Sequence, residues 1–291
     1  MATVFIPKST TDLGGAGVAN GDDVVFGEGQ QSVVTNLNAW AAFASLNSIN
    51  FDPRFTGTVG GGSAGSLLVD VDAGATQIVS YAAGGGALYL AAAGPSAVIS
   101  RLKVIGNGQA NLTGGTFTRV EQRSGRLNIN SSTTVPNLFI SGGEASAQFI
   151  TGTSGYQLVR ISGGRLDTER GLDSDFSGPL MQINGGVVTV GRTDSSSTVP
   201  TGTGSAASGV IEVNGGGTLI WRGGNIDTLR VFGGTVDFSG ITQNISITTL
   251  QIDNVGLSKS TILGSRFFTV TNVSGGTTRV IYGADNDTTL P

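Results

Sequence analysis

Apolar and polar residues alternate on both sides of a glycine pair in a ten-residue pattern that recurs along the chain. The pattern is apolar, any, apolar, any, Gly-Gly, any, apolar, any, apolar. The pairs begin at Gly142, Gly163, Gly185, Gly215 and Gly233, in steps of 21, 22, 30 and 18 residues. Glycine adopts positive φ without steric cost, so each pair predicts a tight turn between two short strands.

Alignment of the copies on the first glycine gives two apolar columns. Two positions before the glycine stand Ile140, Ile161, Ile183, Val213 and Val231. Four positions before it stand Leu138, Val159, Met181, Ile211 and Leu229. Side chains alternate between faces along a strand, so both columns point the same way. We therefore expect two aliphatic ladders inside a coil of stacked strands.

The column between these two is mostly polar and is expected to face outward. It consists of Phe139, Arg160, Gln182, Glu212 and Arg230. Glu212 and Arg230 lie in adjacent copies, so we expect them to be cross-strand neighbours that form an ion pair.

A strand–turn–strand repeat of roughly 20 residues is typical of a solenoid. We predict an all-β fold, a single-stranded parallel β-helix (β-solenoid) of right-handed type. A propeller would need a longer period, of about 40–50 residues. The left-handed hexapeptide type would need a six-residue apolar spacing, which is absent from the sequence.

The pattern divides the chain into four predicted parts. Residues 1–30 form an N-terminal arm, 31–65 a capping segment, 66–265 the β-helix, and 266–291 a closing or intersubunit C-terminal extension. Within the capping segment, Asn38–Leu46 is interpreted either as a short helix or as a loop with a small aromatic cluster.

Composition limits the function. Charged residues make up 12% of the chain, the formal net charge is −4, and Cys and His are absent. Without His the chain lacks the commonest general base and the commonest metal ligand. No basic run indicates nucleic-acid binding, and no apolar run is long enough for a membrane span. We predict a non-enzymatic protein with no catalytic residues, no cofactor and no metal.

One acidic segment is a candidate catalytic site. Asp167, Glu169, Asp173 and Asp175 lie within nine residues, and a carboxylate pair at suitable separation hydrolyses glycosides. The alternative, which we prefer, is a solvated turn with scattered acids. Arg160 and Arg230 are candidates for subunit or glycan contacts, because Arg suits fixed planar contacts.

The chain resembles structural proteins of tailed bacteriophages in its ISGG, INGG, VNGGG and VFGG repeats and its opening MATVFIPKSTTDLGGAGVANGDDVVF. The resemblance implies a virion protein, made in the host cytoplasm, that decorates the capsid surface as a homotrimer and binds the major capsid protein. Two alternatives remain open: a tail fibre or tailspike that binds host-surface glycan, and a bacterial surface adhesin.

Overall fold

The computed structural model describes most of the chain as strands and turns. The described residues are 2–6, 17–27, 33–34, 46–61, 65–70, 78–93, 98–130, 132–147, 158–168, 180–191, 207–222, 225–241, 245–253, 259–264, 268–275 and 279–282. The strands pair in parallel and stack as a β-solenoid, which confirms the predicted fold class. The proposed helix at Asn38–Leu46 lies outside the described residues apart from Leu46, which is buried.

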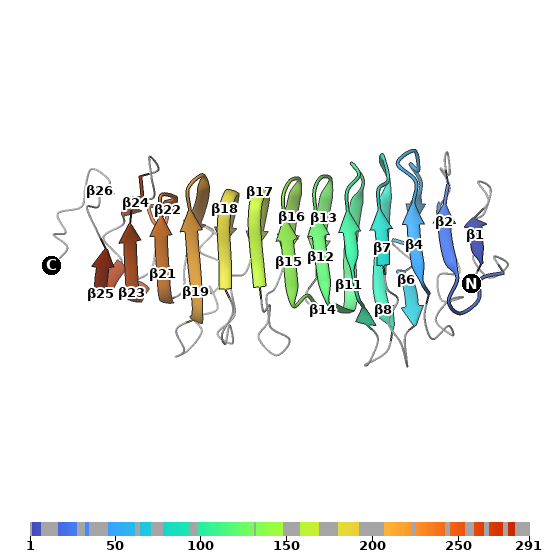
Figure 1. Cartoon of the computed structure of the whole chain (residues 1–291), viewed down its shortest axis with the longest axis horizontal. Coiled ribbons are helices and arrows are strands. Elements are labelled where there is room, and N and C mark those ends of the chain that lie inside the picture. Colours follow the sequence, from blue (N-terminus) through green and yellow to red (C-terminus); the bar gives the residue numbers. More distant parts are fainter. Residues whose placement is uncertain are drawn as a thin grey trace. The chain divides into compact units, whose positions relative to one another are not determined.

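The chain divides into two compact units, Met1–Ala145 and Ser146–Pro291. In the first unit, seven strands form a first sheet in which each pairs in parallel with the next (Figure 1). They are β1 (Thr3–Ile6), β2 (Asp23–Phe26), β4 (Ser48–Phe51), β7 (Ile78–Tyr81), β10 (Leu102–Val104), β12 (Arg119–Gln122) and β15 (Asn137–Ile140).

The strands that come after the turns form a second parallel sheet in this unit. It contains β3 (Val33–Val34), β5 (Thr58–Val59), β6 (Leu67–Asp70), β8 (Ala87–Ala93), β11 (Gln109–Phe117), β13 (Arg126–Ile129) and β16 (Glu144–Ala147). Two short strands, β9 (Val98–Ile99) and β14 (Thr133–Thr134), pair with the end of β11. The two sheets enclose the apolar interior.

Two interior columns run along the first sheet of this unit. The first is aliphatic and buried, and its members in register are Val24, Ile49, Val79, Leu102, Val120 and Leu138. The second contains Phe26, Phe51 and Tyr81, then Val104, Gln122 and Ile140. Phe26 and Phe51 stack with ring centroids 4.5 Å apart, and Tyr81 meets Phe51 edge-on at 5.1 Å.

The second unit repeats the arrangement. Its first sheet contains β17 (Leu158–Thr168), β18 (Leu180–Val190), β19 (Ala207–Asn214), β21 (Ile226–Phe232), β23 (Ile245–Asp253) and β25 (Phe268–Gly275). Its second sheet is formed by the far halves of β17 and β18 with β20 (Gly217–Trp221), β22 (Thr235–Asp237), β24 (Thr261–Gly264) and β26 (Arg279–Tyr282).

The predicted apolar columns are confirmed. In the second unit Val159, Met181, Ile211 and Leu229 are in register and buried. The same holds for Ile161, Ile183, Val213 and Val231. Leu138 and Ile140 occupy the corresponding buried positions in the first unit. Burial of a side chain of this size contributes about 1.5–3 kcal/mol each, so the ladders are the main source of stability.

The glycine turns also stack closely on one another. The second glycine of a pair has positive φ at Gly143, Gly164, Gly186 and Gly216, between 74° and 87°. A Cβ added at Gly186 would lie 2.4 Å from the carbonyl oxygen of Gly164, and one at Gly143 would lie 2.5 Å from that of Gly125. The turns at Gly143 and Gly186 therefore require glycine both for their dihedral angles and for the close approach of the neighbouring backbone.

The coil extends further in both directions than the sequence predicted. Strands β1, β2 and β4 are paired in parallel within the predicted arm and capping segment. Strands β25 and β26 continue the pairing of β23 and β24 within the predicted C-terminal extension. Outward and buried residues alternate along β2 and β4 as expected for strands. The turns after these strands are not marked by a glycine pair, and their interior residues include Phe26 and Phe51.

Candidate contact surfaces

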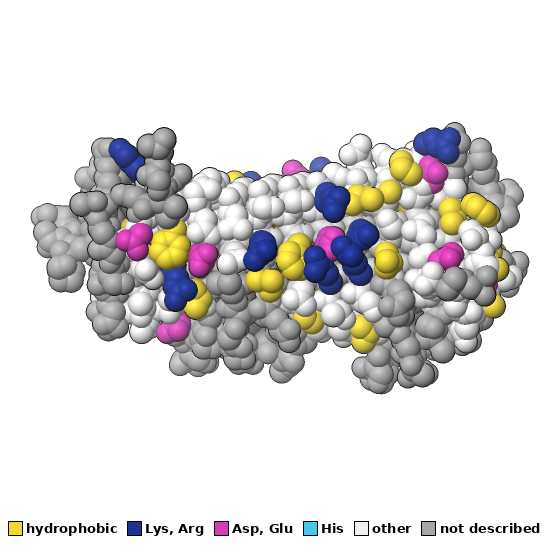
Figure 2. Space-filling view, in the orientation of Figure 1, with side chains coloured by type: hydrophobic (Ala, Val, Ile, Leu, Met, Phe, Trp, Pro, Cys, Tyr) yellow, Lys and Arg dark blue, Asp and Glu magenta, His cyan; other side chains and the backbone are white. Residues whose placement is uncertain are grey.

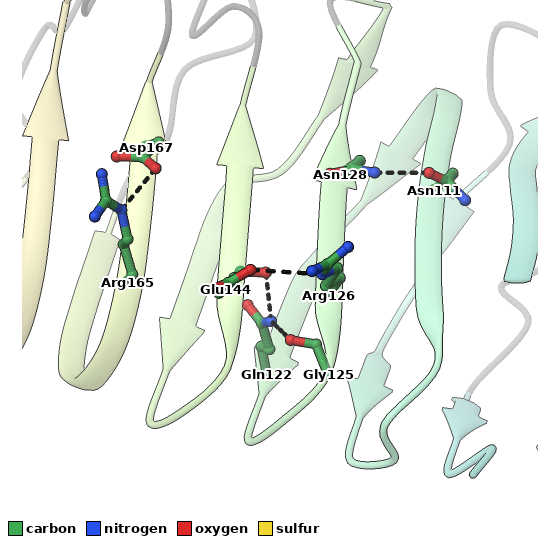
Figure 3. Close-up of polar contacts among 8 residues, drawn as sticks. All are labelled: Asn111, Gln122, Gly125, Arg126, Asn128, Glu144, Arg165 and Asp167. Carbon is green, nitrogen blue, oxygen red and sulfur yellow. Dashed lines mark hydrogen bonds and ion pairs between the residues drawn. The ribbon is translucent and has the colours of Figure 1, made fainter. Parts of the chain in front are cut away.

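The predicted acidic segment is only partly described. Asp167 lies outward on β17, where its carboxylate accepts a hydrogen bond of 2.7 Å from Nε of Arg165 (Figure 3). Glu169, Asp173 and Asp175 lie outside the described residues. The structure thus ties the one described carboxylate of this segment to a neighbouring guanidinium.

Arg160 and Arg230 lie in the outward polar column of the second unit, as predicted. Arg160 donates two hydrogen bonds, of 2.9 and 2.7 Å, to Oε1 of Gln182 on the next strand. Arg230 is the register neighbour of Glu212, which confirms the predicted adjacency. Oε1 of Glu212 accepts hydrogen bonds from Gln182 at 3.5 Å and from Asn214 at 3.0 Å. These carboxylate contacts lie along the column and differ from the predicted ion pair with Arg230.

A second outward surface lies in the first unit and carries four basic side chains. It consists of alternate residues on β10, β12, β15 and the positions beside them, and we call it the basic face. Its members are Arg101, Lys103, Ile105, Arg119, Glu121, Arg123, Asn137, Phe139 and Ser141. Figure 2 shows dark blue side chains gathered around a magenta one over this part of the sheet.

Glu121 organises the centre of the basic face. Its side chain is only 9% exposed, and its Oε1 is 2.5 Å from both Nη2 of Arg101 and Nε of Arg119. Burial raises the pKa of the Glu121 carboxyl, but the hydrogen bonds and the positive charges of Arg119 and Arg101 together lower it by more, so the net shift is downward. The carboxylate is therefore ionised at neutral pH and holds both guanidinium groups in place.

The remaining cations extend this centre. The guanidinium carbon of Arg119 lies 4.3 Å from the ring centroid of Phe139. This cation–π contact holds the Arg119 guanidinium in addition to its contact with Glu121. Lys103 is the register neighbour of Glu121, and Arg123 is exposed beyond it. Four cations surround one carboxylate, so the face carries a formal charge of +3 on a chain of net charge −4.

The second unit carries a surface with the opposite arrangement. Outward positions on β19, β21 and β23 include Glu212, Arg230, Phe232 and Asp253, and Asp227 lies three residues before Arg230 on β21, in contact with Thr228. We call these five residues the acidic face, because three carboxylates accompany one cation. In Figure 2 magenta side chains flank a yellow aromatic group over β21.

A buried amide lies behind the basic face. Gln122 is 1% exposed and occupies the interior column. Its Nε2 donates to the carbonyl oxygens of Gly125 at 3.1 Å and Glu144 at 2.9 Å (Figure 3). These bonds join the turn after β12 to the start of β16, so Gln122 fixes the turn beside Arg123.

Sequence reasoning missed the basic face, although a signal for it was present. The interior residues Leu102 and Val104 alternate with Arg101 and Lys103, and strand alternation therefore places these cations outside. Their grouping with Arg119 depends on the register between β10 and β12, which the sequence does not give directly.

Comparisons with known proteins identify no relative: no family model, curated protein or solved structure matches the chain. Within the described ranges no three His, Cys, Asp or Glu side chains are grouped to hold a metal ion. A search of the same part of the chain finds no helix with the length and apolar character needed to cross a membrane.

Proposed function

We propose that this protein is a non-enzymatic structural protein of a phage particle, which decorates the capsid as a homotrimer and contacts the major capsid protein. The observation that carries the contact role is the preformed basic face. Glu121 and Phe139 hold Arg101 and Arg119 in position before any partner arrives. Side chains that are already ordered lose less conformational entropy on association, which favours recognition by contact.

The scaffold beneath this face supports the same proposal. The interior columns under β10, β12 and β15 are buried, and each strand pairs with its neighbour in register. Such a surface keeps its outward residues at fixed spacing, as a protein that braces its neighbours requires. The assignment to a phage particle is supported by the resemblance of the repeats to phage structural proteins.

The glycan-binding alternative has weaker support. It depends on an acidic groove around Asp167, whose carboxylate is bound to Arg165 in the described residues. At the basic face the only aromatic ring, that of Phe139, carries the guanidinium of Arg119 and is not free to stack on a sugar. We therefore keep a single proposed function.

Cryo-electron microscopy of purified particles, with mass spectrometry to identify the chain, tests this proposal. Density for the β-solenoid in many copies over the head lattice is the expected result. Density confined to the tail would replace the decoration role with a fibre role. Particles that lack the chain would overturn the virion assignment and leave the fold unaffected.

A further inference from the structure

We infer that the basic face of one copy of this chain binds the acidic face of another copy. This inference deepens the proposed function and rests on it in one respect, namely that the protein acts by contact with other subunits. It adds which residues make the contact between copies. Each face is defined by residues of one unit, so the argument needs no assumption about how the two units are arranged.

The two faces have inverse charge layouts. In the basic face a single carboxylate, Glu121, is surrounded by four cations. In the acidic face a single cation, Arg230, is accompanied by three carboxylates. Each face also has a half-buried aromatic side chain, Phe139 in one and Phe232 in the other. Charge complementarity of this kind sets the register and choice of partner in protein interfaces.

The composition of the chain favours a second copy as the source of the acidic surface. The chain has 16 basic and 20 acidic residues. The basic face contains four of the basic residues and one of the acidic residues, so 12 basic and 19 acidic residues lie elsewhere. The rest of each copy thus has a formal charge of −7 and attracts the +3 face of another. Long-range attraction and local complementarity act in the same direction.

The details of the basic face argue against a nucleic acid or a sulfated glycan as its partner. Such polymers present charge of one sign along their length, and the central Glu121 carboxylate would repel them. The face also includes Ile105, which is 39% exposed and needs an apolar contact on the partner. A protein surface that carries both signs of charge and an aromatic side chain satisfies both requirements.

Sedimentation of the purified full-length chain at low and high ionic strength tests self-association. We expect an oligomer at low salt that dissociates as salt increases, because the Debye length shrinks from about 30 Å at 0.01 M to about 3 Å at 1 M. A monomer at all salt concentrations and at up to about 0.1 mM protein, where even a weak contact of micromolar affinity is populated, would overturn the inference.

The first variant is Lys103→Glu with Arg123→Glu. Neither residue supplies the short contacts to Glu121, which come from Arg101 and Arg119, so the centre of the face stays intact. We expect self-association to weaken at least about tenfold, since like charges then meet across the interface. The matched control is Arg54→Glu with Arg126→Glu, which has the same change in net charge at side chains that are 65% and 69% exposed. Equal weakening in both would show that net charge alone acts and would overturn the inference.

Mixing of two variants identifies the partner surface. The double substitution Glu212→Lys with Asp227→Lys disables the acidic face. We expect self-association of this variant alone to be weakened as much as that of the first variant. A mixture of the two variants retains one intact basic face and one intact acidic face, so it should form a 1:1 heterodimer. Failure of the mixture to associate, while circular dichroism shows both variants folded, would overturn the pairing. Heparin binding by a monomeric wild-type chain would instead assign the basic face to a polyanion.

These results are independent of the particle experiment. The chain can self-associate through the two faces without being part of a capsid, and its place on a capsid does not depend on a contact between these two particular faces. Failure of the sedimentation test therefore removes the contact between copies and leaves the particle assignment standing. Absence from particles removes the particle assignment and leaves the contact between copies standing.

Discussion

The second interior column differs between the two units of the solenoid. In the second unit it is aliphatic from β17 to β23, with Ile161, Ile183, Val213, Val231 and Ile252 in register. In the first unit the same column contains two phenylalanines, a tyrosine and the buried amide of Gln122. Both columns are closed to solvent and have the same strand alternation.

The difference shows that the fold requires strand alternation with buried side chains, and does not require one residue type. The aromatic rings fit by stacking on one another, at 4.5 Å between Phe26 and Phe51. Gln122 fits because its amide donates to two carbonyl oxygens. The aliphatic column needs no such partners, and it should respond differently to substitution.

The largest expected effect is a charge in the aliphatic column. Ile183→Asp places a carboxylate among buried Met181, Ile161 and Val213, where the described structure offers it no cation. We expect a loss of about 4 kcal/mol or more, sufficient to unfold the second unit, as measured by circular dichroism and thermal melting. The control Gln182→Asp faces outward and should cost about 1 kcal/mol or less. Wild-type stability of Ile183→Asp would contradict the interior register.

A smaller effect is expected at the stacked turns of the same unit. Gly186 and Gly216 both have positive φ, 74° and 87°. A Cβ at Gly186 meets the Gly164 oxygen at 2.4 Å, whereas one at Gly216 meets nothing closer than 3.8 Å. Gly216→Ala should therefore cost about 1–2 kcal/mol from backbone conformation alone, and Gly186→Ala at least about 1 kcal/mol more. Equal urea midpoints for the two variants would show that the turns do not stack as described.

Substitution of Gln122 tests whether the first unit depends on its polar partners. Gln122→Leu and Gln122→Ala both remove the donors to Gly125 and Glu144, but leucine keeps the volume of the side chain. We expect a cost of about 2–4 kcal/mol for alanine and about 1 kcal/mol for leucine, measured by urea denaturation. Equal losses would mean that the hydrogen bonds outweigh packing at this position.

The smallest effect concerns the first turn of the solenoid. The Asp22 carboxylate accepts hydrogen bonds from the backbone of Ala2 at 2.8 Å and Ala19 at 3.1 Å, which lower its pKa below the ordinary 3.8. Because the pKa is lower in the folded state, the carboxylate stabilises β1 above pH 3.8, and this contribution is lost as pH falls through the folded pKa.

Nuclear magnetic resonance checks this expectation. The amide shifts of Ala2 and Ala19 should titrate together with a midpoint below pH 3.8, while amides of the aliphatic column stay unchanged. The Asp22→Asn variant should show no such titration. A midpoint at or above the ordinary value would contradict the role of these hydrogen bonds.

The sequence predicted the second unit better than the first for a physical reason. Between Leu138 and Asp253 the glycine pairs mark the turns, so alternation on either side gives the interior columns directly. Near the N-terminus, Val24, Ile49 and Val79 are register neighbours separated by 25 and 30 residues, and the strands of Val24 and Ile49 are not directly followed by a glycine pair. The strands of Val24 and Ile49 are therefore predicted as an arm and a cap, whereas Val79 lies within the predicted β-helix.

The candidate contact surfaces were harder to predict than the interior. Arg101 and Arg119 are 18 residues apart and meet at Glu121 only when β10 and β12 are in register. The four acids proposed from local spacing include only one described residue, Asp167, and its partner Arg165 lies on the same strand. Contacts between neighbouring coils join residues that are far apart in sequence, and local spacing does not indicate them.

The register of successive coils also has a consequence for how the chain folds during synthesis. Corresponding positions within each unit lie 17 to 31 residues apart, for example Gln109 and Arg126, or Gly186 and Gly217. The entropy of closing such loops differs by only about 0.5 kcal/mol across this range. At a synthesis rate of about 5–20 residues per second, each emerging coil finds a finished template within a few seconds. The ribosome thus sets the order of assembly, and each coil becomes the surface on which the next one forms.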